Sequence, residues 1–158
     1  DMDPTEFYEA WAYREQGKAL PIFAGVREAL ENIRDRGILL AVLSNRDASS
    51  GRHQLELHGI MHFFHAVVGV GLSLHPKPHP RSTESVLNIF WDYHIHRAEE
   101  MLFVGDTITD LECARNAGIP FAAVLSSGTP EARFIASGLR PERILPSVRE
   151  LPDFLNQS

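Results

Sequence analysis

The stretch MLFVGDTITD, residues 101–110, decides the fold: a short apolar run is closed by a glycine and two aspartates. An ionised carboxylate at the end of a buried strand is costly unless another group compensates its charge. Asp106 stands at that end, and Asp110 follows four residues later, where we expect the first turn of a helix. Two carboxylates placed in this way can approach one hard cation. We therefore interpret Asp106 and Asp110 as metal-binding residues, the alternative being that Asp110 or Thr109 only caps the helix.

Short apolar runs of the same kind alternate with segments of helical pattern along the chain. We expect strands over residues 38–43, 66–70, 101–104 and 121–125, and helices over residues 4–15, 26–36, 49–58, 83–93, 110–117, 130–136 and 148–155. Gly37 is expected to end the second of these helices. Alternation of strand and helix predicts right-handed crossovers and an α/β fold, with a doubly wound parallel sheet and helices on both faces.

The composition limits the classes of protein that fit. The chain has 158 residues, of which 44% are hydrophobic and 23% charged, as expected for one globular domain. Its formal net charge of −6 argues against a general nucleic-acid binder. The longest apolar runs are about six residues, far below the roughly 20 that span a bilayer. These short runs predict no membrane partner. The single cysteine, Cys113, cannot form an internal disulfide, which fits a reducing compartment, so we expect a cytoplasmic protein.

Polar residues suited to a phosphate ester follow two further apolar runs. In an open α/β sheet, ligands bind beyond the carboxyl ends of the strands. Ser44 and Asn45 come directly after the run 38–43, where a hydroxyl and backbone N–H groups can hold phosphate oxygens, although the same pair also suits a plain turn. Lys77 lies in the loop HPKPHP, residues 75–80, whose prolines stiffen the backbone. Its ammonium could neutralise a transferring phosphoryl group or simply be solvated.

Taken in order, these motifs resemble those of the haloacid dehalogenase-like hydrolase superfamily. A serine after a strand, a Lys-Pro-x-Pro loop and a Gly-Asp-x-x-x-Asp segment are similar to that superfamily's second, third and fourth motifs. The resemblance extends from about residue 23 to residue 154. Residues 110–118, DLECARNAG, also resemble the helix that follows the metal motif in phosphoglycolate phosphatase-like members.

The resemblance implies a function and a role for each residue. It implies a magnesium-dependent phosphatase that hydrolyses a small phosphorylated metabolite through an aspartyl-phosphate intermediate. Ser44 and Asn45 would bind phosphate, Lys77 would neutralise its charge, and Asp106 would bind Mg²⁺ with Asp110 as a ligand or as support for one. In such a reaction, covalent catalysis splits one hard displacement into two easier steps.

The superfamily's first motif, Asp-x-Asp-x-Thr, carries the nucleophile at the tip of a central strand. Asp1 and Asp3 match its letters in DMDPT, residues 1–5. An amphipathic helical pattern follows them, with proline and acidic residues suited to a first turn, so we interpret this string as a helix start that matches by coincidence. We expect residues 1–20 to be the end of a helical cap and residues 21–158 to be the core domain. The nucleophile and its strand, between the strands ending in Ser44 and Asp106, are expected to lie outside these residues, which would leave the isolated chain poorly stable and inactive.

Two other functions fit parts of the pattern. The first is a binding or regulatory module that keeps the phosphate-binding residues without turnover. The second is a phospho-accepting receiver domain, which ranks last because its lysine should follow its aspartates, whereas Lys77 precedes Asp106. The histidine pairs His75 with His79 and His94 with His96 lack the cysteine or glutamate pattern of a zinc site, so we do not assign them to metal. The sequence does not predict which phosphoester is cleaved or the oligomeric state.

Overall fold

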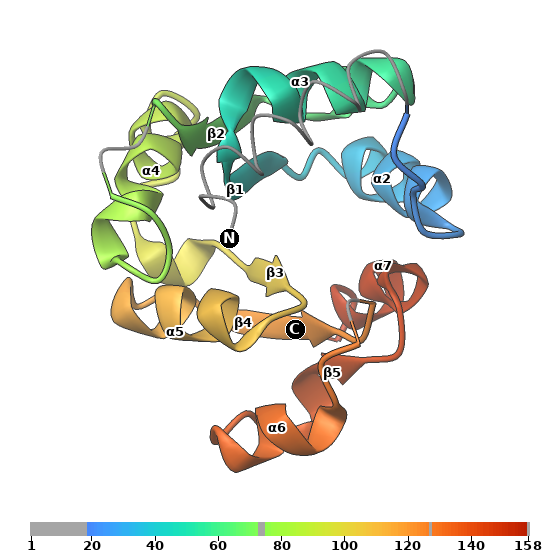
Figure 1. Cartoon of the computed structure of the whole chain (residues 1–158), viewed down its shortest axis with the longest axis vertical. Coiled ribbons are helices and arrows are strands. Elements are labelled where there is room, and N and C mark those ends of the chain that lie inside the picture. The colour runs from blue at the N-terminus through green and yellow to red at the C-terminus, as the bar shows by residue number, and fades with distance from the viewer. Residues whose placement is uncertain (1–18, 73–74, 127, 158) are drawn as a thin grey trace, which may run out of the picture.

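The fold is an α/β arrangement in which strands and helices alternate along the chain (Figure 1). The computed structural model describes residues 19–72, 75–126 and 128–157. The helices are α2 (Val26–Asp35), α3 (Ala48–Leu57), α4 (Glu84–Trp91), α5 (Ile108–Asn116), α6 (Glu131–Ala136) and α7 (Leu151–Phe154). The strands are β1 (Ala41–Asp47), β2 (Ala66–Val70), β3 (Phe103–Gly105), β4 (Phe121–Val124) and β5 (Ile144–Leu145). Short 3-10 helices are η1 (Met61–Phe63), η2 (Pro80–Thr83), η3 (Ala98–Glu100), η4 (Pro141–Arg143) and η5 (Val148–Glu150).

The predicted fold class is confirmed, and the strand pairs among the described residues are all parallel. In the first sheet β1 pairs with β2, and in the second the order is β3, β4, β5. Within the described residues no strand joins β1 to β3, so the sheet is split at the place where we expected the central strand to be absent. The helix expected over residues 4–15 lies outside the described residues.

Several boundaries differ from the predictions. The strand predicted over residues 38–43 begins at Ala41 and continues to Asp47, so Ser44 and Asn45 belong to the strand and do not follow it. The helix predicted from Asp110 begins two residues earlier, at Ile108. The two-residue strand β5 was not predicted, because a pair of apolar residues between short helices shows no period of its own.

Helices cover both faces of the first sheet. On one face, Ala41 and Leu43 of β1 pack against Val86 and Phe90 of α4. On the other face, Leu40 packs with residues of α2 and α3. Adjacent positions of a strand point to opposite faces, and the run has helices on both sides, but its burial is less than the sequence predicted: Ile38 is exposed and residues 39–43 are only half-buried.

The second sheet is covered in the same way. Phe121 and Ala123 of β4 pack with residues of α5 and with Phe134 of α6. Val124 packs on the other side with Ile33 of α2 and Leu151 of α7. Gly37 adopts a φ of 73° just beyond α2, and its N–H bonds to Arg34 O at 2.8 Å, which confirms its predicted place at the helix end.

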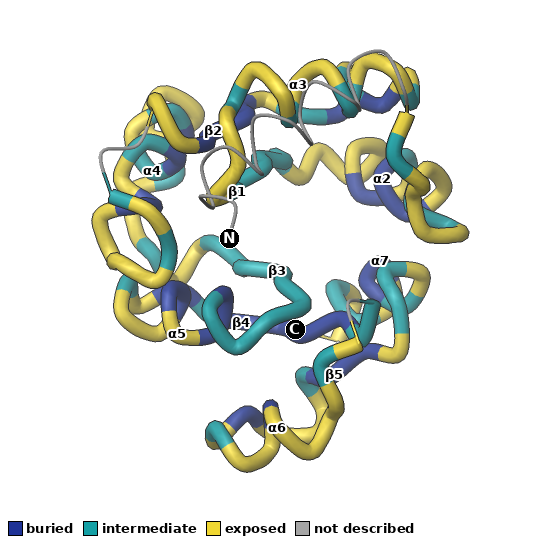
Figure 2. Tube along the Cα trace, viewed as in Figure 1, coloured by how far each residue is buried: buried dark blue, intermediate teal, exposed yellow. Residues whose placement is uncertain are grey.

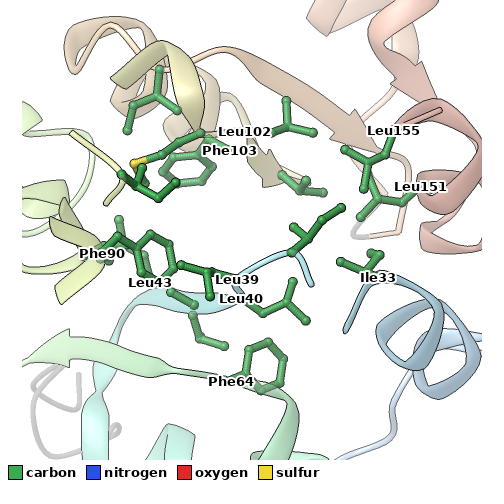
Figure 3. Close-up of a pocket in the computed structure, with 18 of the residues that line it drawn as sticks. Ile33, Leu39, Leu40, Leu43, Phe64, Phe90, Leu102, Phe103, Leu151 and Leu155 are labelled. Carbon is green, nitrogen blue, oxygen red and sulfur yellow. The ribbon is translucent and has the colours of Figure 1, made fainter. Parts of the chain in front are cut away.

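An apolar cavity separates the two sheets. Its volume is about 630 Å³, and its walls include residues of β1, β3, α2, α4 and α7 (Figure 3). Leu39, Leu40 and Leu43 lie on one side of it, and Leu102 and Phe103 on the other. Figure 2 shows the effect on burial: β2 and β4 are buried, whereas the apolar residues of β1 and β3 beside the cavity reach only intermediate burial.

None of the helices within residues 19–72, 75–126 and 128–157 combines the length and the apolar character that a membrane crossing requires.

Candidate active site

A β-bulge in β1 forms one side of the candidate site. Leu43 pairs with Val68 and Asp47 pairs with Val70, so three residues of β1 lie opposite the single residue Gly69 of β2. Extra residues of this kind bend a strand and redirect its side chains. A Cβ atom at Gly69 would lie 2.3 Å from Arg46 O, so only glycine leaves room for the bulged backbone.

The bulge presents Ser44 and Asn45 at the carboxyl end of β1. The Ser44 Oγ accepts a hydrogen bond from Arg46 N–H at 3.0 Å. The Asn45 side chain makes two hydrogen bonds to one residue: Nδ2 donates to Lys77 O at 3.0 Å, and Oδ1 accepts from Lys77 N–H at 2.7 Å. The structure thus brings Asn45 and the Lys77 loop together, although 32 positions separate these two residues in the sequence.

The Lys77 side chain extends from its loop toward the gap between the sheets. Its Nζ lies 2.6 Å from Asp110 Oδ1 and donates to Leu43 O at 3.2 Å. It also lies 5.8 Å from the centre of the Phe103 ring. The lysine and Asp110 side chains are only 13% and 7% exposed, so this ion pair is largely removed from water. Lys77 thus contacts Leu43 of β1 and Asp110, which lies in the first turn of the helix after β3, so one side chain links the two sheets.

A capping box at the start of α5 fixes Asp110. Thr107 is the N-cap: its Oγ1 donates to Asp110 Oδ2 at 2.6 Å, its N–H donates to the same oxygen at 3.2 Å, and Asp110 N–H donates back to Thr107 Oγ1. The alternative interpretation, in which Asp110 or Thr109 is the N-cap, is therefore wrong. The signal for the correct residue is the threonine three positions before an acidic residue, which is the usual spacing of a capping box.

Gly105 allows Asp110 to sit against the end of β3. A Cβ atom at Gly105 would lie 2.5 Å from the Asp110 Cβ atom and 2.9 Å from its Oδ2. The glycine that precedes Asp106 is thus needed for close approach of the helix, and its backbone angle is not in the left-handed region. Asp106 itself lies between Gly105 and the N-cap Thr107, partly buried at the tip of β3.

The donor set of the site suits magnesium in part. Mg²⁺ usually keeps several waters and takes only one or two carboxylates, with substrate phosphates completing its ligands. Asp106 can supply one such carboxylate. Both oxygens of Asp110 accept hydrogen bonds from Lys77 and Thr107, which favours a supporting role over direct ligation. No group of three or more His, Cys, Asp or Glu that could hold a metal occurs in the part of the chain that the structure describes.

Helix α5 also packs on the far side of the Lys77 loop. The buried Cys113 Sγ lies 3.1 Å from Ser82 Oγ of η2, and Asn116 Nδ2 donates to Pro78 O at 3.2 Å. Burial raises the pKa of the Cys113 thiol. Asp1 and Asp3, the matches to the first motif, lie outside the described residues, so the structure does not place them.

The sequence profile of the haloacid dehalogenase-like hydrolases matches residues 1–124. The chain belongs to this family. It is 34% identical to a phosphoglycolate phosphatase of Vibrio cholerae over 113 residues, which are 72% of this chain and 46% of that protein. It is also 26% identical to a pyrophosphatase of Oceanobacillus iheyensis over 145 residues, which are 92% of this chain and 65% of that protein. This chain thus spans about half the length of the phosphoglycolate phosphatase.

Solved structures agree with the family assignment. A haloacid dehalogenase superfamily hydrolase of Geobacter sulfurreducens superposes with a TM-score of 0.71 and 29% identity, over 97% of this chain and 68% of that one. The L-2-haloacid dehalogenase of Xanthobacter autotrophicus has a TM-score of 0.73 at 23% identity, over 98% of this chain and 69% of that one. At that identity the second comparison shows a shared fold only.

Proposed function

We propose that the protein is a magnesium-dependent phosphatase that hydrolyses a small phosphomonoester through an aspartyl-phosphate intermediate. The observation that carries this proposal is the buried ion pair of Lys77 and Asp110 beside Asp106, at the carboxyl ends of β1 and β3. A cation held in a low-dielectric site stabilises negative charge far better than one in water. The phosphoglycolate phosphatase relative supports a phosphorylated metabolite as the class of substrate.

The described side chains would divide the work as follows. The hydroxyl of Ser44 and the backbone N–H groups of the bulge, that of Asn45 included, would bind phosphoryl oxygens. The Lys77 ammonium would balance charge on the same oxygens as the P–O bond breaks. Asp106 would hold Mg²⁺, with Asp110 orienting the surrounding groups. When bound, magnesium supplies Lewis-acid stabilisation of charge on the transferring group.

A nucleophilic carboxylate would complete the site, and the apolar cavity suggests where its strand fits. One extended strand between β1 and β3 could pair in parallel with both, and its side chains would fill the cavity lined by Leu40, Leu43 and Phe103. The carboxyl end of such a strand would emerge between Ser44 and Asp106. An aspartate there would face the Lys77 ammonium, in reach of a bound phosphoryl group.

The test is phosphate release by the full-length protein from a panel of small phosphomonoesters. We expect release that requires Mg²⁺, stops on chelation, and falls by at least about 100-fold in Asp106→Asn, because the metal site contributes several kcal/mol to the transition state. Asp92→Asn, at an exposed position after α4, is the matched control and should keep full activity. Release that continues at the same rate in excess chelator would contradict the proposal.

A binding or regulatory module is the second candidate. It is favoured by one observation: Asp110, the carboxylate that pairs with Lys77, already accepts hydrogen bonds on both oxygens from Lys77 and Thr107, so it is not available as a nucleophile. The same preparation separates the two candidates. Saturable binding of inorganic phosphate without any turnover of the panel would support the module and exclude the enzyme.

A further inference from the structure

The Asn45 side chain makes two hydrogen bonds to the loop that carries Lys77. Both of its polar atoms bond to the backbone of one residue, Lys77, at 3.0 Å and 2.7 Å. A carboxamide that donates to a C=O and accepts from the N–H of the same residue imitates a neighbouring strand, because it carries the same donor and acceptor pair as a peptide group. Asn45 thereby fixes the backbone from which the lysine side chain extends.

The local fold of β1 is what makes this contact possible. In a regular ladder the position of Asn45 would pair with β2, but the bulge of residues 44–46 releases it toward the Lys77 loop. The bulge depends in turn on Gly69, since a Cβ there would lie 2.3 Å from Arg46 O and 2.7 Å from Ala48 N. Gly69 of β2 therefore permits the bulge that turns the Asn45 side chain toward the Lys77 loop.

The loop is held from its other side by α5. Asn116 donates to Pro78 O at 3.2 Å, one residue beyond Lys77, and Cys113 contacts Ser82 in η2. The loop is thus fixed at β1 and at α5, which belong to the two sides of the gap. The contacts from α5 reach Pro78 and Ser82, whereas the two hydrogen bonds of Asn45 are made to the backbone of Lys77 itself.

We propose that the Asn45 side chain is a positioning residue, which sets the place of the Lys77 ammonium and does not itself act on the substrate. Lys77 Nζ lies 2.6 Å from Asp110 Oδ1 and 3.2 Å from Leu43 O, and a fixed backbone limits the conformations in which the flexible lysine stem can keep these contacts and face a bound phosphoryl group. A shift of about 1 Å in a catalytic group can cost about 100-fold in rate. The effect on turnover rests on the proposed phosphatase function, whereas the effect on the loop does not.

The first experiment measures the loop without using activity. Hydrogen exchange of the Lys77 amide is followed in the full-length protein and in its Asn45→Ala variant, with the amide of Val68 in β2 as an internal reference for folding. We expect Lys77 to exchange about tenfold faster in the variant, because its N–H loses its acceptor, while Val68 keeps its protection. Asn88→Ala, at an exposed position of α4, should change neither amide. Unchanged exchange at Lys77 in Asn45→Ala would overturn the proposal.

The second experiment asks whether Asn45 acts through the lysine. Asn45→Ala, Lys77→Ala and the double variant are compared in the phosphate-release assay. We expect Asn45→Ala to lower kcat by about 10- to 100-fold with a smaller change in KM, and to add less than about twofold in the Lys77→Ala background. Independent, multiplying effects would mean that the Asn45 side chain binds phosphate directly, which would refute a positioning role.

A conservative variant tests whether one of the two hydrogen bonds is enough to protect the Lys77 amide. In Asn45→Asp the carboxylate still accepts from Lys77 N–H but cannot donate to Lys77 O, so exchange at Lys77 should stay slower than in Asn45→Ala. Wild-type protein without phosphatase activity would refute the proposed function, and the exchange data would still decide whether Asn45 fixes the loop. The two failures are therefore distinguishable.

Discussion

Replacing Asp110 with asparagine should destabilise the protein far more than the small change in shape suggests. The Asp110 and Lys77 side chains are 7% and 13% exposed, and their charged atoms lie 2.6 Å apart. Removing one partner of a buried pair leaves the other charge uncompensated, at a cost of about 3–5 kcal/mol. The lysine keeps its bond to Leu43 O and some contact with water, so we expect the lower end of this range, about 3 kcal/mol.

Asparagine also cannot replace every hydrogen bond of the carboxylate. Asp110 Oδ1 accepts from Lys77 Nζ, and Oδ2 accepts from both the N–H and the hydroxyl of Thr107. An amide that turns its oxygen toward Lys77 places its NH₂ against the Thr107 N–H, which sets two donors face to face. The opposite orientation places the NH₂ against the ammonium. Either way, one buried group loses its acceptor.

The measurement is equilibrium urea unfolding of the wild type and Asp110→Asn, with m-values compared to check two-state behaviour. Asp35→Asn is the matched control, because Asp35 pairs with Arg34 at 3.0 Å while their side chains are 68% and 45% exposed. Exposed pairs contribute about 0–1 kcal/mol, so the control should lose less than about 1 kcal/mol. Similar losses in the two variants would show that the pair at the site is solvated and that our account of its burial is mistaken.

Three further predictions concern single residues. Asp47 caps α3 and accepts hydrogen bonds from Ser49 and the backbone of α3, which lower the pKa of its carboxyl. At pH values above the ordinary pKa of aspartate, Asp47→Ala should lower the free energy of unfolding by about 1 kcal/mol. This difference should vanish as the pH falls through the lowered pKa, which urea midpoints measured at several pH values would show. Burial raises the pKa of the Cys113 thiol, so iodoacetamide at pH 8 should label it slowly in the native state and rapidly in urea, and equal rates would contradict its burial. In Gly105→Ala the new Cβ would lie 2.5 Å from the Asp110 Cβ, so we expect a loss of about 1–3 kcal/mol in thermal or urea unfolding, and an unchanged midpoint would exclude the close approach.

The order of the elements could be predicted because apolar runs and helical patterns are local. The strand Ala66–Val70 has the predicted bounds, and Gly37 ends α2 as expected. The limits of β1 were wrong because an apolar run reports burial and not backbone pairing. Leu39 and Leu40 are apolar and pack without belonging to the strand, while the polar residues 44–46 extend it.

The contacts within the site were less accessible from the sequence. Ser44, Lys77, Asp106 and Asp110 were predicted as separate strand-end groups, and the structure joins Lys77 to Asp110 directly. The bulge that aims Asn45 could not be predicted, because it depends on Gly69 in another strand and a single glycine there is not a local signal. The roles of these residues in phosphate and metal binding stay predictions.

The gap between the two sheets has a consequence for how the molecule folds. Among the described residues no backbone hydrogen bond of a strand ladder crosses from β1 to β3, so the β1–β2 and β3–β5 halves are coupled only through side chains and loops. We expect such halves to open separately under native conditions, so that their amides exchange with different free energies of opening. A strand that pairs with both edges would merge them into one unit. Ser44 and Asp106 lie on opposite sides of the gap, so such a strand would also hold these two residues at a fixed separation. A mutation that weakens its pairing would then lower both the stability of the fold and any activity that needs the two residues together.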